Sequence, residues 1–265
     1  MGEKTGISWT DATVNFWQGC HKVSAGCMNC YMFAEKRRYG QTANVVIRSA
    51  PATFNAPLKW AKNREKYGHI NRVFVCSWSD FFIEEADAWR DEAWEIMRRT
   101  PHLTYQICTK RPERIKECLP PEWGIGFSNV WIGVTAENQE TADERIPILL
   151  KTPAAVRFIS AEPLLGPIDL HQCGAIVSES FPEASSCDGS DGWYEIAKID
   201  WLICGGESGP NARPMLCEWA DSLQWNCRSA RVPFFFKQGS QNNWQTFKDF
   251  NSFSDNLRVR QFPKG

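Results

Sequence analysis

The sequence predicts an α/β protein with parallel strands, arranged as a full or partial (β/α) barrel of the TIM type. Three observations predict this fold. Short apolar runs rich in Val, Ile, Phe and Trp recur along the chain, polar segments with helical spacing lie between them, and polar side chains follow most of the runs. Seven such runs in 265 residues favour a barrel, while an open doubly wound sheet is the structural alternative.

The expected strands are short and apolar over most of their length, as strands buried on both faces are. A long polar connection follows the first strand. The other six strands come after it, with helix-like segments between them. The seven ranges are 13–20, 72–78, 104–110, 129–135, 155–161, 200–206 and 232–238.

Helices are expected between the strands because the connecting segments show a spacing of three to four residues. Residues 85–100 place Trp89, Ala93, Trp94 and Met97 near one helix face, which predicts an amphipathic helix. Strands that alternate with helices form βαβ units, whose strands are parallel. Similar patterns occupy residues 111–119, 138–152 and 217–231.

Two segments depart from this alternation. Residues 35–70 form a long basic connection, which we expect to contain helices and a loop facing the substrate. Residues 171–198 are rich in Ser and Gly and indicate an inserted loop or lid. Within that insertion, Cys173 and Cys187 form a second metal site or are part of a plain exposed insertion.

The domain organisation follows from these departures. We expect one barrel domain over residues 1–240, interrupted by the insertion at 171–198. Residues 241–265 carry aromatic side chains at near-helical spacing, which indicates a C-terminal covering segment rather than a cofactor site.

Composition is ordinary for a soluble globular protein, with 43% hydrophobic and 23% charged residues. The formal net charge of -1 gives no global preference for nucleic acid. The start has no apolar signal segment, and no stretch approaches the roughly 20 apolar residues of a membrane helix, so we expect a cytoplasmic protein without membrane contact. The 11 cysteines are an odd number and do not indicate a disulfide framework.

Polar side chains at the ends of six strands predict one polar pocket. In a parallel barrel the C-terminal ends of the strands meet on one face, where catalytic and binding residues gather. A mixture of carboxylates and cations suits a zwitterionic ligand with amino, carboxylate and hydroxyl groups, and the glycines allow close backbone approach. The residues are Ser77, Ser79, Asp80, Lys110, Arg111, Glu137, Asn138, Glu162, Gly205, Gly206, Glu207, Ser208 and Lys237.

Three cysteines with C-x6-C-x2-C spacing follow the first strand, and so belong to the same face. Cys20, Cys27 and Cys30 could hold three irons of a [4Fe-4S] cluster, which leaves the fourth iron open to a chelating ligand. Alternatively, His21 joins them in a Cys3His zinc site, although its position next to Cys20 strains simultaneous ligation. Free thiols in a loop are the third interpretation.

Several passages resemble a known family. They are residues 6–31 "GISWTDATVNFWQGCHKVSAGCMNCY", 109–114 "TKRPER", 158–170 "FISAEPLLGPIDL", 205–215 "GGESGPNARPM" and 233–238 "PFFFKQ". Together they resemble a phage- and bacteria-associated three-cysteine-motif family of unknown function. That family is similar to the radical S-adenosylmethionine (SAM) superfamily, and the resemblance covers the chain except for the insertion and the tail.

The resemblance implies a radical SAM-type enzyme with a radical-SAM-like barrel. The cluster bound by Cys20, Cys27 and Cys30 would cleave SAM reductively, and the resulting 5′-deoxyadenosyl radical would take a hydrogen atom from the substrate. It also implies a reductant such as flavodoxin or ferredoxin, in a bacterial or phage-infected cell. By pocket position, the SAM contacts would come from Ser77, Ser79, Asp80, Lys110, Glu137, Asn138, Glu162, Gly205, Gly206, Glu207, Ser208 and Lys237.

The motif departs from the superfamily's usual C-x3-C-x2-C pattern. Its first gap has six residues, and Asn29 stands before the last cysteine where an aromatic residue is usual, while Tyr31 follows it. The usual glycine-rich motif after the second strand is replaced by "SWSDFF" at residues 77–82. The resemblance therefore carries over the three cysteines residue by residue, and the SAM contacts only by position.

The phage association predicts a nucleotide or nucleic-acid base as substrate. Tyr39, Trp60 and Tyr67 in the basic connection would supply stacking surfaces for such a ligand. The alternative function is a non-enzymatic, zinc-stabilised module that binds nucleic acid or a partner. Four convergent carboxylates argue against that alternative, because a binding module has no use for them.

Overall fold

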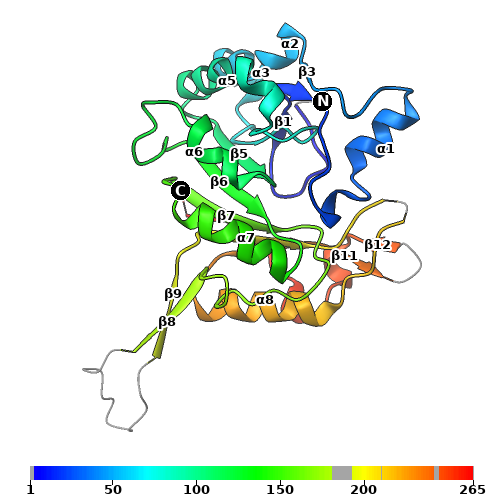
Figure 1. Ribbon diagram of the computed structural model, residues 1–265, viewed down its shortest axis with the longest axis vertical. Helices are drawn as coiled ribbons and strands as arrows, with labels where there is room; N and C mark the ends of the chain where they lie inside the picture. Colours follow the sequence, from blue (N-terminus) through cyan, green and yellow to red (C-terminus); the bar gives the residue numbers. More distant parts are fainter. Residues whose placement is uncertain (1–2, 181–192, 210, 242–244, 265) are drawn as a thin grey trace.

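The structure is a computed structural model that describes residues 3–180, 193–209, 211–241 and 245–264. Its centre is an eight-stranded sheet in the order β1-β4-β5-β6-β7-β10-β11-β12 (Figure 1). Neighbouring strands are parallel from β1 to β11, and β12 runs antiparallel to β11. The bounds are β1 Ala12–Val14, β4 Arg72–Val75, β5 Thr104–Thr109, β6 Val130–Thr135, β7 Val156–Ala161, β10 Trp201–Gly205, β11 Phe234–Gln241 and β12 Gln245–Phe247.

All seven expected strands are present, and only the first differs markedly in extent. The sheet contains Ala12–Val14 of that run, and the chain then leaves the sheet at Asn15, whose side-chain Oδ1 accepts a hydrogen bond from the Trp78 backbone N–H at 2.7 Å. The rest of the run forms β2 (Trp17–Gln18), which pairs antiparallel with β3 (Ile47–Arg48). This small second sheet leads directly into the first cysteine.

The main sheet is not closed. Within the described residues, β1 pairs only with β4 and β12 pairs only with β11, so the two ends of the sheet do not meet. The expectation of a full TIM-type barrel is therefore wrong for this part of the chain. The doubly wound alternative is also wrong, because the strand order runs in one direction without the reversal that defines such a sheet.

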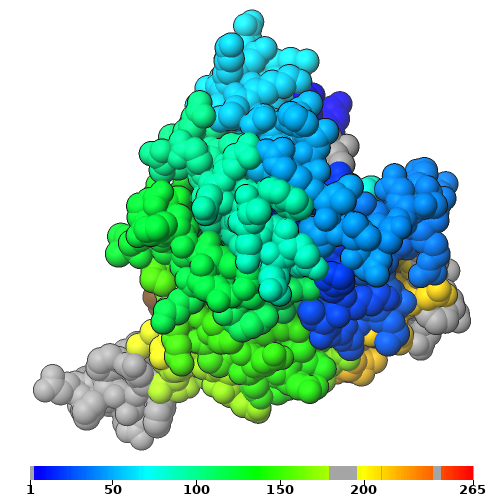
Figure 2. Space-filling model, turned by 45° about the horizontal axis from the view of Figure 1, so that its top comes forward, coloured from blue at the N-terminus to red at the C-terminus, as the bar shows by residue number. Residues whose placement is uncertain are grey.

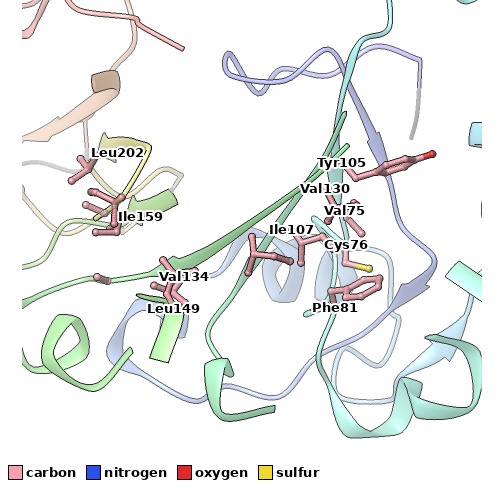
Figure 3. Packing of buried hydrophobic residues seen from close by; sticks show 14 of the residues in the cluster. Val75, Cys76, Phe81, Tyr105, Ile107, Val130, Val134, Leu149, Ile159 and Leu202 are labelled. Atoms are coloured by element: carbon pink, nitrogen blue, oxygen red, sulfur yellow. The ribbon is translucent and has the colours of Figure 1, made fainter. Parts of the chain in front are cut away.

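Helices connect most of the parallel strands and cover one face of the sheet. Right-handed crossovers that always step in the same direction place their helices on the same side. The main core lies between these helices and side chains such as Val75, Ile107 and Val134, and Figure 3 shows part of it. The helices are α5 (Asp87–Arg99), α6 (Ile115–Cys118), α7 (Gln139–Leu150) and α8 (Cys217–Ser229).

The other face of the sheet carries a second, aromatic core. Trp201 lies at its centre, is fully buried, and donates its indole N–H to the Gln261 carbonyl at 2.9 Å. Rings pack around it with centroid distances of 5.7 Å to Phe158 and 5.8 Å to Trp131. These rings cover this face of the sheet. The polar side chains of the sequence prediction instead follow the C-terminal ends of the strands.

Replacing Trp201 by alanine should destabilise the protein by about 3–5 kcal/mol, because it removes a large ring from a packed core and leaves a cavity. Urea unfolding followed by circular dichroism measures this change. The matched control is Trp225→Ala on α8, where the indole is 62% exposed and the expected change is within about 0.5 kcal/mol. Equal losses for the two variants would contradict the central position of Trp201.

The basic connection contains the expected helices, which are short, with irregular residues between the first and second of them. It contains α1 (Tyr31–Arg38), α2 (Pro51–Phe54), α3 (Ala56–Lys62) and α4 (Arg64–Tyr67). Trp60 and Tyr67 are buried in the main core, so the expectation that they stack on a ligand is wrong. Tyr39 remains exposed.

The expected insertion contains an antiparallel hairpin of β8 (Ile176–Ser180) and β9 (Trp193–Ala197). In Figure 1 these strands project from the body on the side away from α1, so the described part of the segment does not cover the cysteines as a lid. Cys173 is buried and donates its thiol to the Leu170 carbonyl at 3.5 Å, whereas Cys187 lies outside the described residues. Across the described ranges, we find no helix both long and apolar enough to span a bilayer.

Candidate functional site

A pocket of about 230 Å³ lies at the C-terminal ends of the parallel strands. All three cysteines of the C-x6-C-x2-C motif line it, together with nine of the twelve residues expected to contact a cofactor. The structure therefore brings together side chains that are more than two hundred positions apart in the sequence. The nine are Ser77, Ser79, Asp80, Lys110, Glu162, Gly206, Glu207, Ser208 and Lys237.

Local backbone geometry shapes the loop that carries the cysteines. Gly19 has φ +99°, and a side chain there would overlap the Val45 carbonyl, so only glycine allows the chain to turn into Cys20. A short 3-10 helix, Ala25–Cys27, follows, and Cys30 is the residue immediately before α1. We refer to residues 19–30 as the cysteine loop.

Glu137 supports the cysteine loop from outside the pocket lining. Its carboxylate accepts a hydrogen bond from Ser24 Oγ at 2.6 Å and one from Arg145 Nη1 at 3.1 Å. Gly26 packs so closely that a Cβ would overlap this carboxylate. Both Glu137 and Arg145 are buried, so the carboxylate is an internal anchor. Sequence reasoning missed Ser24 and Arg145, for which no local pattern exists.

The two other expected residues outside the lining have structural contacts. Asn138 caps α7, where its Oδ1 accepts the Thr141 backbone N–H at 3.0 Å and Thr141 Oγ1 accepts the Asn138 N–H at 3.2 Å. Asn138 therefore stabilises the start of α7 rather than lining the pocket. Gly205 packs against the side chain of Glu162.

Asp80 positions the cation that contacts the first cysteine. Its carboxylate accepts hydrogen bonds from Thr109 Oγ1 at 2.7 Å and from the Lys110 backbone N–H at 2.9 Å, and pairs with Arg111 Nη1 at 3.3 Å. Arg111 in turn reaches Cys20 Sγ at 3.7 Å. Asp80 is therefore occupied by protein groups, and its contribution to the pocket is to hold Arg111 beside the thiol.

Burial and neighbouring charges shift the pKa values of Cys20 and Lys110. Burial, and then the negative charge of Asp80, raise the pKa of the Cys20 thiol to about 11, although Arg111 opposes the shift. Burial alone would lower the pKa of Lys110, but the carboxylate of Glu137 and the thiol group of Cys27 outweigh it and raise the pKa. The Lys110 ammonium is thus a stable positive charge next to the cysteines.

Lys110 has no carboxylate in direct contact with its ammonium group among the described residues. Its Nζ donates to Thr135 Oγ1 at 3.3 Å, and no carboxylate in the described part of the chain forms an ion pair with it. By contrast, Lys237 pairs with Glu162 at 2.6 Å. A half-buried ammonium without a direct carboxylate partner favours an anionic group in the pocket.

The loop after β10 is joined to the cysteine loop by hydrogen bonds. Glu207 accepts hydrogen bonds from Arg213 Nη2 at 2.6 Å and from Asn29 Nδ2 at 2.9 Å, and Asn29 also donates to the Asn211 carbonyl at 2.8 Å. Burial would raise the pKa of Glu207, but its hydrogen bonds with Arg213 and Asn29 lower it. The position that departs from the superfamily pattern, Asn29, is therefore a cross-link between two loops.

Tyr31 makes a second cross-link on the opposite side of the loop. Its hydroxyl donates to the Ser77 carbonyl at 2.5 Å, which joins the start of α1 to the segment after β4. The sequence shows the unusual placement of Tyr31 but not its partner. Every residue has a backbone carbonyl, so the sequence cannot indicate which one accepts this hydrogen bond.

The cysteines are the residues that could hold a soft metal centre, because thiolates bind zinc and iron–sulfur clusters. His21 is engaged elsewhere, with its Nε2 2.5 Å from Glu85 Oε1. Among the described residues, no three His, Cys, Asp or Glu side chains surround one point closely enough to hold a single metal ion. The arrangement thus gathers three separate thiols around a pocket rather than around one point.

Comparison with known proteins identifies a family but no activity. Residues 4–259 match the model of a family described as "Protein of unknown function (DUF5131)". No curated protein and no solved structure matches the chain. Nothing in these comparisons links the chain to the radical SAM superfamily, so that resemblance stays a prediction. Because the match spans nearly the whole sequence, the chain belongs to the DUF5131 family.

Proposed function

We propose that this protein is a radical SAM-type enzyme that binds a [4Fe-4S] cluster through Cys20, Cys27 and Cys30. The observation that carries the proposal is that all three thiols line one pocket at the C-terminal ends of parallel strands, together with nine of the residues expected there. The one-directional strand order supports an open, partial (β/α) barrel as the scaffold.

The arrangement of the three cysteine sulfurs favours an iron–sulfur cluster over a single zinc ion. In a [4Fe-4S] cluster each thiolate binds a different iron, so the three sulfurs need not converge on one point. A Cys3His zinc site would require His21, whose ring is paired with Glu85. Arg111 at Cys20 and the half-buried Lys110 provide positive charge that would offset the negative thiolates.

The pocket offers polar partners for SAM beside the cysteines. With both groups bound, the cluster and SAM would supply one-electron cleavage of the sulfonium and hydrogen-atom abstraction. Glu162 and Glu207, held by Lys237 and Arg213, present carboxylate oxygens for an amine or for ribose hydroxyls. Apolar Trp9 and Phe74 also line the pocket and would limit entry of water.

Anaerobic purification followed by iron, sulfide and zinc determination tests the proposal. We expect about four irons and four sulfides per chain, SAM binding in a titration, and 5′-deoxyadenosine after reduction with dithionite. An intact cluster that yields no 5′-deoxyadenosine would contradict the enzymatic proposal. One zinc without sulfide would instead support a zinc-stabilised module that binds nucleic acid or a partner. A nucleotide or nucleic-acid base remains the proposed substrate class.

Lys110→Met should lower the midpoint potential of the cluster, because it removes a half-buried positive charge in the pocket that favours the added electron. We expect a shift of roughly 60 mV, equivalent to a tenfold change for one electron. Redox titration followed by electron paramagnetic resonance measures it independently of turnover. Lys116→Met, which removes an exposed lysine on α6, is the control. Equal potentials for wild type and Lys110→Met would show that Lys110 does not compensate the cluster.

A further inference from the structure

Exposed apolar side chains are concentrated beside the cysteine loop. Of the ten large hydrophobic side chains exposed in the described part of the chain, six come from residues 23–47. A surface that gathers apolar side chains in this way marks an interaction site more often than scattered ones do. The six are Val23, Met28, Tyr31, Tyr39, Val45 and Ile47.

Backbone contacts join these residues into one region. The Cys20 N–H donates to the Ala43 carbonyl at 3.0 Å, and Gly19 packs against the carbonyl of Val45, so the strand-like segment 43–47 flanks the cysteine loop. On the other side of the loop, α1 follows Cys30 directly. Figure 2 shows the blue segment that contains α1 as a projecting lobe of the surface. We call residues 19–30, α1 and residues 39–47 the docking surface.

The docking surface has an excess of positive charge. Its exposed cations are Lys22, Arg37 and Arg38, and its exposed carboxylate is Glu35. The Lys22 ammonium donates a hydrogen bond to the Met28 backbone carbonyl at 2.8 Å, which holds this cation within the cysteine loop. Arg37 and Arg38 have no ion-pair partner in the described residues. Exposed apolar side chains together with an excess of cations are complementary to a protein that carries acidic groups around an apolar contact.

We infer that this surface docks an acidic electron-transfer protein that reduces the cluster. The inference rests on the proposed function and goes beyond it by naming the surface. Met28 lies between Cys27 and Cys30 in the chain and is 60% exposed, so a partner seated there would lie against the cluster-binding loop. One electron would leave the reduced partner and enter the cluster, with no bond made or broken. The exposed aliphatic side chains of Val23 and Val45 suit a protein contact better than a phosphate backbone.

The test uses reduced bacterial flavodoxin as the electron donor and the full-length reconstituted protein. Arg37→Glu with Arg38→Glu reverses two exposed charges away from the pocket lining. Lys62→Glu with Arg64→Glu makes the same change in net charge on exposed positions of α3 and α4 and is the matched control. Cluster reduction by flavodoxin is followed by stopped-flow absorbance at several salt concentrations. Flavodoxin binding to the cluster-free protein is measured by calorimetry.

We expect the Arg37/Arg38 variant to slow reduction by flavodoxin by about tenfold or more at low salt, with weaker binding and a weaker salt dependence. The Lys62/Arg64 variant should behave like wild type. Dithionite, a small reductant that needs no docking, should reduce all three proteins equally and support equal 5′-deoxyadenosine formation.

The two hypotheses fail in different ways. If wild type with an intact cluster forms no 5′-deoxyadenosine with dithionite, the proposed function fails. If dithionite works but flavodoxin reduces both double variants as fast as wild type, the docking surface is wrong. Loss of single-stranded oligonucleotide binding in the Arg37/Arg38 variant, with unchanged reduction by flavodoxin, would also overturn the inference and assign the surface to nucleic acid.

Discussion

Replacing Cys20, Cys27 or Cys30 singly by alanine is expected to abolish SAM cleavage and to remove most of the iron from the reconstituted protein. Each thiolate would hold a different iron, so losing one leaves two ligands for a cluster that needs three. We expect 5′-deoxyadenosine to fall to background in all three variants. Iron and sulfide content, measured on the same samples, separates cluster loss from a defect in SAM binding.

Cys217→Ser is the matched control for these variants. Cys217 is an exposed thiol at the start of α8 and does not line the pocket. Its replacement should leave iron, sulfide and 5′-deoxyadenosine at wild-type levels. If a single alanine at Cys20, Cys27 or Cys30 retained the full cluster and full activity, that cysteine would not be a ligand.

Glu137→Ala is expected to destabilise the fold by about 3–5 kcal/mol, because it leaves the buried guanidinium of Arg145 without its partner. The variant also removes the acceptor of the Ser24 hydroxyl, so the cysteine loop loses an anchor. Urea unfolding of the cluster-free protein measures the first effect. Iron retained after reconstitution measures the second, which a purely local change in SAM contacts would not alter.

A double-mutant cycle isolates the ion pair. Arg145→Met alone should also be destabilising, because it leaves a buried carboxylate unpaired, whereas Glu137→Ala combined with Arg145→Met removes both charges. We expect the double variant to be more stable than the sum of the single losses predicts. Additive losses would show that Glu137 and Arg145 do not interact as the structure indicates. Asp143→Ala, at an exposed position on α7, is the control for changes on this helix.

Much of the sheet was predictable because its signal is local. The run at residues 104–110 is apolar, short and followed by a cation, and it forms β5 with Lys110 at its end. The same pattern placed Glu162 after β7 and Glu207 after β10. Since parallel strands present their C-terminal ends on one side, this local information was enough to predict a shared pocket.

The individual roles of the carboxylates were not predictable, because they depend on groups that meet only in the folded chain. Glu137 and Glu162 follow neighbouring strands in the same way, yet Glu137 is an anchor for Ser24 and Glu162 lines the pocket. The contact of Glu137 with Ser24 joins residues 113 positions apart. Likewise, the sequence is compatible with Trp60 as an exposed stacking surface or as a core residue. The packing of α3 makes it a buried core residue.

The sequence by itself determined the strands, their parallel direction and the three cysteines on the pocket side. These features follow from hydrophobic patterning and from the order of elements along the chain, which a sequence displays directly. Only the tertiary structure decided that the sheet stays open, that Asn29 cross-links to Glu207, and that Arg111 reaches Cys20. The physical reason is that sheet closure and side-chain pairing depend on distances between remote segments, which burial and packing set only when the whole chain has folded.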